Sequence, residues 1–320
     1  MDVPGTGSLR GMGVESRQDR EVAIRAAGLS KRYGATLALD RLDLAIPAGE
    51  VYGYLGPNGA GKTTTIRLVL GLQRPTAGSA HLFGIDAWSD PVPAHRRVAF
   101  VAGEPMLWPA LTGLECLEFL ARIRGGTDAA YRRVLIERFA FDPDKRVRDY
   151  SKGNRQKIQL IAAFSARPDL LVLDEPTSGL DPLMEAAFRD TVAEARTTGQ
   201  TVFLSSHILS EVEALCDRVG ILREGRLVEE GTLAELRHLS ARVVEATFDG
   251  SPPTLALPEG VTATTVGENA LRFDVRGPVG PLVDRLAGTG VVGLVSREPT
   301  LEELFLAHYD RRAEGVSVPG

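Results

Sequence analysis

The first apolar pattern after residue 20 is a series of short segments separated by turn residues. Segments of this kind lie at residues 22–24, 37–39 and 42–46, and they predict strands of an antiparallel β layer. Residues 51–55 then form a continuous apolar run, and Ile66, Val69 and Leu70 follow it at helical spacing. The pattern therefore predicts that the antiparallel layer leads into a strand, a glycine-rich loop and a helix.

The middle of the chain, from about residue 105 to 167, has mostly helical periodicity. Thr112 and Glu115 form a capping box at the start of one helix. Two continuous apolar runs, at residues 170–173 and 201–204, are typical of parallel strands that are buried on both faces. We therefore expect a helical subdomain that is inserted between the strands of a parallel core.

A second series of short apolar segments begins beyond Gly231. It predicts a helix at residues 279–286 and strands at residues 242–248, 261–266, 271–275 and 291–295. Thr300 and Glu303 form another capping box, which predicts a last helix with apolar positions at Leu301, Leu304, Phe305 and Ala307. We expect a small α+β domain over residues 239–312 and a tail at residues 313–320. Because no catalytic cluster is evident in this domain, we expect it to regulate or to dock.

Composition and charge narrow the class of protein. The 320 residues are enough for two domains, and 43% hydrophobic and 25% charged residues are typical of a soluble globular protein. Lys and Arg number 37 and Asp and Glu number 42, so the net charge of −5 argues against nucleic acid as the main partner. Cys116 and Cys216 lie in apolar helical patterns without metal-ligand spacing, as buried thiols in a reducing cytosol do.

Membrane and targeting signals are missing from the sequence pattern. No apolar run approaches the roughly 18 residues that cross a bilayer. Residues 1–20 contain four glycines and several acids but not the apolar segment of a signal peptide. We therefore expect a flexible tail at residues 1–20 and a cytoplasmic protein.

The loop between the first buried strand and its helix carries the clearest chemical signal. Gly56 to Thr63 reads GPNGAGKT and matches the phosphate-loop pattern G-x-x-x-x-G-K-[ST] at every fixed position. The glycines let backbone N–H groups approach a polyphosphate, and the helix that begins near Lys62 points its positive end at the anion. We expect Lys62 to pair with the β- and γ-phosphates, Thr63 to ligate Mg²⁺, and Thr64 to reach an α- or β-phosphate oxygen.

Charged residues stand at the ends of the two later buried strands. Asp174 comes 112 residues after Lys62, directly after the run at residues 170–173, and Glu175 follows it. A carboxylate there can hold the Mg²⁺ shell and its neighbour can address the γ-phosphate, whereas the ordinary alternative is helix capping. His207 follows the neighbouring strand, where a phosphate contact is easy, although a His at a strand end is often structural.

Three further features have ordinary structural interpretations beside functional ones. Ser151, in the stretch YSKGNRQK, precedes a helical pattern and is typical of an N-cap, and its charged neighbours are typical of a solvated face. Residues 178–181 form a turn in which Asp181 caps a helix that begins with Pro182. Tyr33 is an isolated aromatic that suits either half-buried packing or stacking on a flat base.

Together these motifs resemble the ATP-binding subunits of ABC transporters over about residues 21–237. In that family a phosphate loop is followed by a signature that starts a helix, a metal-binding Asp with an adjacent Glu, a D-loop and a switch histidine. The corresponding positions occur here in the same order: residues 56–63, 151–154, 174–175, 178–181 and His207. Tyr33 occupies the position of the aromatic that stacks on adenine. The ending REPTLEELFLAHY is similar to that of stand-alone ATPase subunits of bacterial drug and antibiotic exporters.

Two positions depart from the family's usual sequence. Gly103, in FVAGEP, stands where the family usually has a Gln that helps to ligate Mg²⁺ and senses the γ-phosphate. Glu104 or a water molecule could take over that role, and the sequence leaves both open. The signature reads Tyr-Ser-Lys-Gly-Asn rather than LSGGQ, but it retains Ser151 and Gly153, the two positions that would face a phosphate.

The resemblance implies an α/β fold: a P-loop NTPase (RecA-like) core over residues 21–238, with an antiparallel β layer and a helical subdomain at about residues 105–167. It implies an ATPase that closes as a head-to-tail homodimer around two ATP molecules and Mg²⁺. It also implies a separately encoded polytopic membrane permease, a location on the cytoplasmic face of the cell membrane, and export of drugs, antibiotics or other small molecules.

The resemblance and the motifs together assign the candidate site residues. Those expected to bind the nucleotide are Tyr33, Gly56, Pro57, Asn58, Gly59, Ala60, Gly61, Lys62, Thr63, Thr64, Ser151, Gly153, Asn154 and Asp181. Thr63 and Asp174 are expected to hold Mg²⁺. Glu175 is expected to be the general base on the attacking water, and His207 to bridge Glu175 and the γ-phosphate.

Two other classes of function are compatible with part of this pattern. A soluble ABC-type ATPase that acts on ribosomes or DNA could use the basic stretch at residues 145–157 as a contact surface. Such proteins commonly have two nucleotide-binding halves or a long coiled coil, and this chain has one set of motifs and no sustained heptads. A non-catalytic ATP-dependent scaffold would fit Gly103 but not the intact Glu175 and His207.

Overall fold

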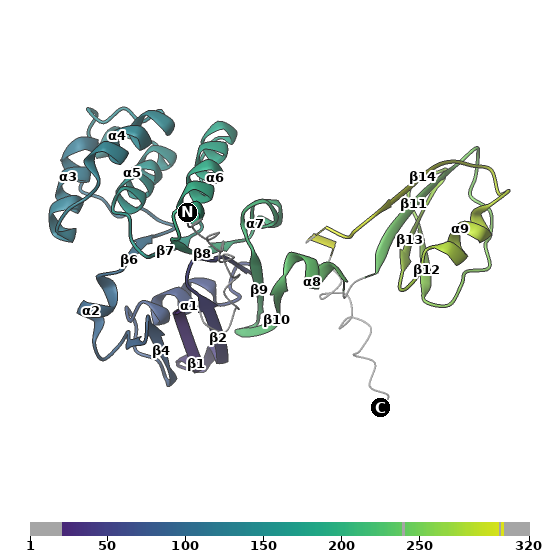
Figure 1. Ribbon diagram of the computed structural model, residues 1–320, viewed down its shortest axis with the longest axis horizontal. Coiled ribbons are helices and arrows are strands. Elements are labelled where there is room, and N and C mark those ends of the chain that lie inside the picture. Colours follow the sequence, from purple (N-terminus) through teal and green to yellow (C-terminus); the bar gives the residue numbers. More distant parts are fainter. Residues whose placement is uncertain (1–20, 239–240, 301, 304–320) are drawn as a thin grey trace, which may run out of the picture.

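The computed structural model describes residues 21–238, 241–300 and 302–303, and this part of the chain forms three β-sheets (Figure 1). The first sheet is the antiparallel layer, with strand order β2-β1-β4-β5. Its strands are β1 (Val22–Tyr33), β2 (Thr36–Pro47), β4 (Ala77–Leu82) and β5 (Ile85–Asp86). The apolar segments at residues 37–39 and 42–46 both belong to β2, because Arg41, at a φ of 48°, interrupts the alternation without ending the strand.

The second sheet is the parallel core, with strand order β10-β9-β3-β8-β7-β6. All neighbouring pairs are parallel except the edge strand β10, which runs antiparallel to β9. The strands are β3 (Val51–Leu55), β6 (Val98–Val101), β7 (Leu170–Asp174), β8 (Thr201–Ser206), β9 (Arg218–Arg223) and β10 (Arg226–Thr232). Every residue of β3, β7 and β8 is buried, as the continuous apolar runs predict.

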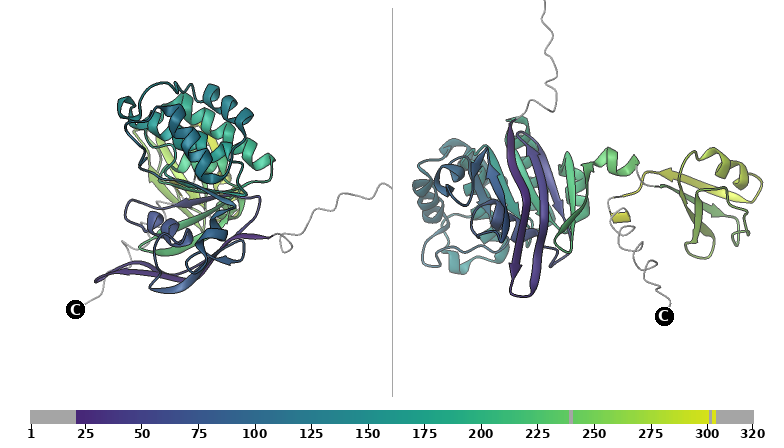
Figure 2. Two further views of the ribbon diagram at one scale, coloured as in Figure 1. Left: turned by 90° about the vertical axis from the view of Figure 1, so that its left-hand side faces the viewer. Right: turned by 90° about the horizontal axis from the view of Figure 1, so that it is seen from below.

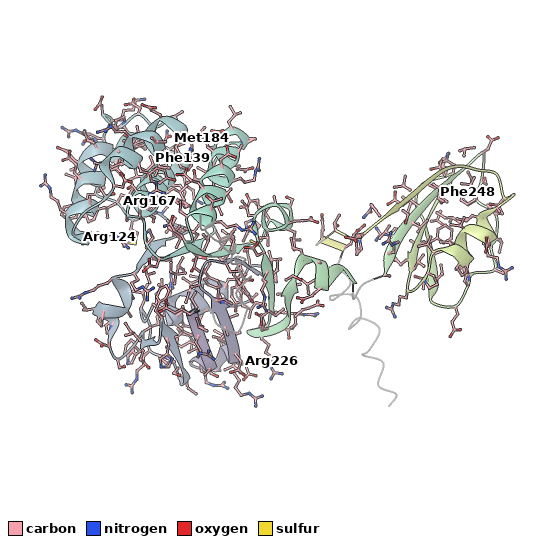
Figure 3. The ribbon with its side chains drawn as sticks, viewed as in Figure 1. Arg124, Phe139, Arg167, Met184, Arg226 and Phe248 are labelled. Atoms are coloured by element: carbon pink, nitrogen blue, oxygen red, sulfur yellow. The ribbon has the colours of Figure 1, made fainter. Side chains whose placement is uncertain are left out.

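Two hydrophobic cores cover the two faces of the parallel sheet. One contains α1 and the inner face of the antiparallel layer, and it includes Ile24, Tyr54, Ile66 and Phe203. The other contains the helical insertion and helix α6 (Pro182–Thr197), and it includes Phe139, Phe164 and Phe188. Figure 1 and Figure 2 show the antiparallel layer and the inserted helices on opposite sides of the sheet, and Figure 3 labels Phe139, a residue of the second core, among the inserted helices. The sheet is therefore shielded from solvent on both faces.

The helices connect these strands and place the loops at one edge of the sheet. They are α1 (Lys62–Val69), α2 (Pro91–His95), α3 (Gly113–Arg124), α4 (Ala129–Arg138), α5 (Lys152–Ser165), α6 (Pro182–Thr197), α7 (Leu209–Leu215) and α8 (Leu233–His238), with a 3-10 turn at Val147–Asp149. The predicted capping box is present: Thr112 Oγ1 accepts from the Glu115 amide, and Glu115 accepts from the Thr112 amide. Helices α3, α4 and α5 form the helical subdomain between β6 and β7.

The C-terminal unit has its own sheet and core. The sheet order is β12-β13-β11-β14, made of β11 (Arg242–Phe248), β12 (Val261–Thr265), β13 (Ala270–Val275) and β14 (Val291–Arg297), with α9 (Gly280–Leu286) on one face. Leu282 and Leu286 of α9 pack on Val244, Phe248 and Phe273. Thr300 and Glu303 form the predicted capping box, whereas Leu301, Leu304, Phe305 and Ala307 of the expected last helix lie outside the described residues.

The described architecture confirms the predicted fold class, an α/β P-loop core with an antiparallel layer, a helical insertion and a small α+β C-terminal unit. In residues 21–238, 241–300 and 302–303 no helix has the length and apolar character needed to span a bilayer.

Candidate functional site

The loop from Gly56 to Gly61 joins β3 to α1 at the carboxyl edge of the parallel sheet. Gly59 and Gly61 have φ values of 84° and 111°, a region that glycine adopts without strain. A Cβ at Gly61 would lie 2.6 Å from the Ala38 carbonyl oxygen, and one at Gly56 would lie 2.6 Å from the Leu222 carbonyl oxygen. The glycines are therefore required both by backbone conformation and by close packing against neighbouring strands.

Lys62 places a positive charge inside this loop. Its side chain is buried, with 6% exposed. The Nζ atom donates to the Gly56 carbonyl at 2.6 Å and to the Pro57 carbonyl at 3.3 Å, and lies 3.3 Å from Glu175 Oε1. Two carbonyl groups of the loop therefore bind the Lys62 ammonium group, which also faces Glu175 after β7.

Asp174 is held between α1 and β8 by two hydroxyl groups. Thr63 Oγ1 donates to its Oδ2 at 3.0 Å, and Ser205 Oγ donates to its Oδ1 at 2.6 Å. These contacts arise because β3, β7 and β8 are parallel neighbours whose carboxyl ends meet at one edge. The two residues predicted to hold Mg²⁺ are thus in direct contact with each other.

Glu175 has a strained backbone and two side-chain partners, Lys62 and His207. Its φ is 48°, which a residue with a side chain rarely adopts. Its amide donates to the Ser205 carbonyl at 3.1 Å, and its Oε2 is hydrogen-bonded to His207 Nδ1 at 2.5 Å. Since Oε1 faces Lys62, the carboxylate is fixed by a lysine on one side and a histidine on the other.

A cavity of about 730 Å³ opens over these groups. Most of its lining comes from the phosphate loop, the ends of β7 and β8, and the segment after β6. The lining residues are Ala38, Pro57, Asn58, Gly59, Gly61, Lys62, Thr63, Thr64, Arg67, Phe100, Ala102, Gly103, Glu104, Met106, Asp174, Glu175, Ser178 and His207. Gly56 and Ala60 are not among the lining residues. Ala60 is buried, and its carbonyl accepts from the Gly225 amide.

The signature residues and Asp181 lie outside the lining of this cavity. Ser151 is the N-cap of α5 and accepts from the Asn154 amide at 3.3 Å. A Cβ at Gly153 would lie 2.3 Å from the carbonyl oxygen of Gly179 in the same chain. Asp181 is the N-cap of α6, and its carboxylate accepts from two backbone amides. The structure therefore joins the signature to the turn at residues 178–181 rather than to the phosphate loop of its own chain.

Tyr33 also lies outside the cavity lining. Its hydroxyl donates to Gln73 Oε1, and Lys31 Nζ lies 5.1 Å from the centre of its ring. The residue is 44% exposed, so the ring is accessible to a ligand only in part.

Sequence reasoning assigned no role to several residues that the structure places at the site. Ser205 holds both Asp174 and the Glu175 amide, and Gln159 Oε1 accepts from the Ala102 amide next to Gly103. The signal for Ser205 was its position at the carboxyl end of a buried parallel strand, where neighbouring strand ends meet. Gln159 gave no comparable signal, because its position on a helix does not reveal which loop it reaches.

The donor set of the cavity fits a nucleoside triphosphate with Mg²⁺. Backbone N–H groups at the start of α1 and the buried Lys62 ammonium suit phosphate oxygens. The Thr63 hydroxyl and the Asp174 carboxylate are hard oxygen donors, which Mg²⁺ prefers. Among the described residues no group of three or more His, Cys, Asp or Glu side chains could hold a metal ion alone. A Mg²⁺ ion held by Thr63 and Asp174 would complete its shell with water or phosphate oxygens.

Three features define a P-loop nucleoside triphosphatase: a phosphate loop after β3, an Asp and a Glu at the carboxyl end of β7, and a His after β8, which lies between β3 and β7 in the parallel sheet. The sequence model of the ABC transporter family matches residues 39–178. The chain is 35% identical over 298 residues to the bacitracin transport ATP-binding protein BcrA of Enterococcus faecalis, with 89% of this chain and 96% of that protein covered. The chain therefore belongs to the ATP-binding proteins of the ABC transporter family.

Two further comparisons agree. The chain is 41% identical over 220 residues to the daunorubicin/doxorubicin resistance ATP-binding protein DrrA of Streptomyces peucetius, with 67% of each chain covered. A solved ATP-binding subunit of an ABC transporter superposes with a TM-score of 0.64 and 33% identity, over 68% of this chain and 92% of that chain. This protein is an ATP-binding and ATP-hydrolysing subunit of an ABC transporter, which confirms the predicted activity and disfavours the soluble ribosome- or DNA-acting alternative.

Proposed function

We propose that this chain powers an exporter of drugs, antibiotics or other small molecules from the cytoplasmic face of the cell membrane. Support comes from the relatives named for bacitracin transport and for daunorubicin/doxorubicin resistance. The single observation that carries the catalytic part is the Lys62–Glu175–His207 arrangement at one end of the 730 Å³ cavity.

Glu175 is the general base in this proposal. Its carboxylate borders the cavity and is oriented by Lys62 on one oxygen and by His207 on the other. Lys62 and the N-terminus of α1 bind phosphate oxygens, and Thr63 and Asp174 hold Mg²⁺. Bound Mg²⁺ supplies charge neutralisation at the phosphate oxygens. Glu175 then takes the proton of the attacking water, and His207 keeps the carboxylate turned toward the cavity.

A second copy of the chain completes each site in this proposal. Ser151, Gly153, Asn154 and Asp181 do not line the chain's own cavity, so they reach a nucleotide only on a partner. The N-terminus of α5 would then add donors to the γ-phosphate across a head-to-tail homodimer. Tyr33 keeps its proposed role in stacking on adenine, because 44% of its side chain is exposed.

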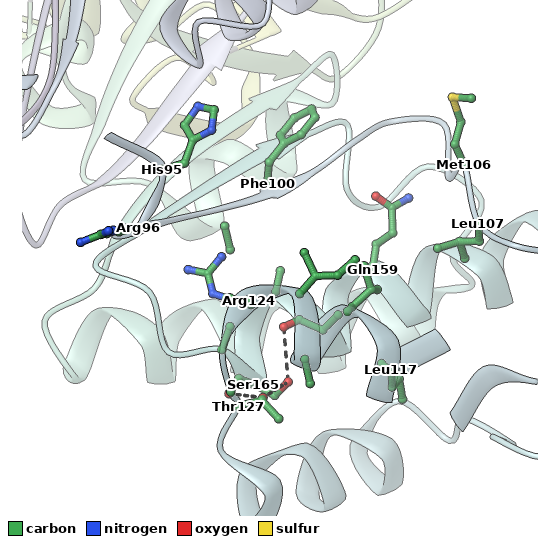
Figure 4. Close-up of a pocket in the computed structure, with 18 of the residues that line it drawn as sticks. His95, Arg96, Phe100, Met106, Leu107, Leu117, Arg124, Thr127, Gln159 and Ser165 are labelled. Atoms are coloured by element: carbon green, nitrogen blue, oxygen red, sulfur yellow. Dashed lines mark hydrogen bonds between the residues drawn. The ribbon is translucent and has the colours of Figure 1, made fainter. Parts of the chain in front are cut away.

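A groove between the parallel core and the helical subdomain is the proposed docking site of the membrane permease. Its volume is about 740 Å³, and Figure 4 shows Phe100, Met106, Leu107 and Gln159 around it. Trp108 also lines the groove and packs edge-on against Phe119, with ring centroids 4.6 Å apart. Exposed aromatic and aliphatic groups of this kind are suited to receiving a helix of a partner. The C-terminal unit, proposed to begin near residue 239, regulates or docks.

The substitution Glu175→Gln tests the catalytic proposal. The amide keeps the size and hydrogen-bonding shape of the side chain but cannot take a proton, so ATP turnover should fall by about 10³-fold or more while ATP binding persists. On gel filtration with ATP and Mg²⁺ the variant should elute as a dimer. Glu268→Gln, an exposed position between β12 and β13, is the matched control and should behave as the unmodified chain. A variant that turns over ATP normally, or elutes only as a monomer, would contradict the proposal.

Affinity purification from detergent-solubilised cells tests the partner. A polytopic membrane protein in stoichiometric amount is the expected result. Leu107→Asp in the groove should abolish its recovery without changing ATP binding, because a buried charge opposes apolar docking. Recovery of ribosomal proteins or nucleic acid instead would contradict the transporter assignment of the partner.

A further inference from the structure

Glu211 is a buried acid on α7 that has no assigned role. Its side chain is only 6% exposed, although glutamate is almost never fully buried unless it is paired. Its Oε2 accepts from Thr177 Oγ1 at 3.0 Å and from Ser206 Oγ at 3.2 Å. Its Oε1 is buried and has no hydrogen-bond partner in the described structure. One oxygen of Glu211 therefore joins two segments that are far apart in the sequence.

Both segments carry proposed catalytic groups. Thr177 lies two residues after Glu175 in the loop that follows β7, and the Ser178 amide donates back to the Glu175 carbonyl at 3.2 Å. Ser206 directly precedes His207 at the end of β8, and its hydroxyl also accepts from the Ile208 amide at 2.9 Å. A displacement of Glu211 would therefore displace the segments that carry Glu175 and His207, the two partners of the hydrogen bond at the site.

The close approach of α7 to the sheet depends on Gly53. A Cβ at this position of β3 would lie 2.4 Å from Val212 Cγ1 and 2.9 Å from Cys216 Sγ. Only a residue without a side chain lets α7 sit this deep. Val212 is fully buried and directly follows Glu211. The contact between Gly53 and Val212 therefore also determines how close the Glu211 carboxylate lies to the sheet.

Helix capping does not explain Glu211. It lies in the first turn of α7, where an acid could bond to free backbone amides, but both of its hydrogen bonds come from side-chain hydroxyls of other elements. The N-cap residue of α7, Ile208, makes no side-chain cap hydrogen bond. Burial raises the pKa of Glu211, and the charges of Glu185 and Glu175 raise it further, while the two hydroxyl bonds lower it. An acid held in such surroundings costs stability that an apolar side chain would not.

We propose that Glu211 is a positioning residue for ATP hydrolysis, which clamps Thr177 and Ser206 so that Glu175 and His207 keep their mutual orientation. The inference rests on the proposed catalytic roles of Glu175 and His207. It accounts for the φ of 48° at Glu175, because a strained backbone persists only where neighbouring contacts fix it, and the clamp acts two residues further on.

The substitution Thr177→Val tests the clamp without opening a cavity. Valine keeps the shape of threonine and removes the hydroxyl, so kcat should fall by about tenfold or more while KM for ATP and the affinity for a fluorescent ATP analogue change by less than about threefold. Thr191→Val is the matched control, because Thr191 is also buried and hydrogen-bonded, to the Ala187 carbonyl, but lies in the middle of α6. The backbone amides of Glu175 and of residues 177–180 should exchange hydrogen faster in Thr177→Val only.

Substitutions of Glu211 itself complete the test. Glu211→Ala should lower kcat at least as much as Thr177→Val, and the double variant should be no worse than Glu211→Ala, because both changes break one clamp. Glu211→Gln retains an oxygen that accepts from both hydroxyls and should restore kcat to within about threefold of the unmodified chain.

Separate outcomes contradict the clamp and the proposed function. If Glu175→Gln is inactive but Thr177→Val turns over ATP like Thr191→Val, the clamp is wrong and the role of Glu175 stands. If Glu211→Gln is as impaired as Glu211→Ala, the acceptor geometry is not what matters, and the clamp is again wrong. If Glu175→Gln keeps full turnover, the proposed function fails, and the inference fails with it.

Discussion

Replacing Gly153 by alanine would introduce one methyl group where the backbones of α5 and the following turn meet. The Cβ would lie 2.3 Å from the Gly179 carbonyl oxygen and 3.2 Å from its carbonyl carbon. The nearest atom belongs to backbone and cannot rotate away. Because Cβ atoms essentially never approach closer than 3.0 Å, α5 and the turn must separate by at least about 0.7 Å. Gly153 does not adopt a positive φ, so alanine brings no backbone strain of its own.

The magnitude follows from this displacement. Forcing an extra methyl group into a packed contact costs about 1–3 kcal/mol, and about 2 kcal/mol lowers Tm by roughly 4–8 °C in a domain of this size. The turn that moves also contains Ser178, whose hydroxyl accepts from Lys152 at 2.9 Å and whose amide bonds to the Glu175 carbonyl. Since displacements near 1 Å can cost 10²-fold in rate, we expect ATP turnover to fall by about 10- to 100-fold.

Thermal denaturation and steady-state ATP turnover measure both effects. Gly280→Ala is the matched control, because Gly280 also lies in the first turn of a helix, has no positive φ, and has no atom within 4 Å of its Cβ position. It should retain full turnover and stability. If Gly153→Ala has the same Tm and the same rate of ATP turnover as Gly280→Ala, the contact between α5 and the turn does not constrain the site. The argument that close packing requires glycine at position 153 is then refuted.

Two further predictions concern other parts of the chain. Glu104 borders the cavity beside Gly103, so Glu104→Gln should raise the Mg²⁺ concentration for half-maximal turnover by about tenfold, and an unchanged Mg²⁺ titration would exclude it as the substitute for the missing Gln. A hydrogen bond from the Arg297 guanidinium lowers the pKa of Glu303 to about 2, so the stabilisation is complete above the unfolded pKa near 4.5 and is lost as pH falls toward 2. Glu303→Gln should therefore destabilise the C-terminal unit by about 2–3 kcal/mol at pH 7 and little at pH 2, and calorimetry at both pH values checks this.

That the phosphate loop, Asp174, Glu175 and His207 lie together could be predicted from the sequence, because the signals for their positions are local. The fixed positions of the phosphate loop require one backbone conformation, and the buried strands before Asp174 and His207 place those residues at the same edge of a parallel sheet. Burial on both faces produces continuous apolar runs, which can be recognised in one sequence without knowledge of the partners. The contacts between Lys62, Asp174 and their neighbours then follow from the topology.

The features that could not be predicted are contacts between residues that lie far apart in the sequence. Gly153 was expected to face a phosphate, and no pattern in the sequence indicates that it also abuts the backbone of Gly179. The contacts of Glu211 with Thr177 and Ser206 depend on how deeply α7 packs against Gly53, which no periodicity encodes. The predicted roles of Tyr33 and of the signature residues stay predictions, since they concern a nucleotide or a second chain.

The connections of the helical insertion determine how it can move. The chain enters the insertion from the carboxyl end of β6 and leaves it toward the amino end of β7. Because β6 and β7 are parallel neighbours, the two attachments lie at opposite ends of these strands. The exit is fixed, because Asp169 is bonded to Arg97 at 2.5 Å and the Leu170 amide donates to the Arg97 carbonyl. The entry passes Gly103 beside the nucleotide cavity, where the Ala102 amide is bonded to Gln159 of α5. Phe100 and Met106 line both the nucleotide cavity and the groove, so a change at Gly103 would reach the groove where the permease is proposed to dock through one short segment of chain.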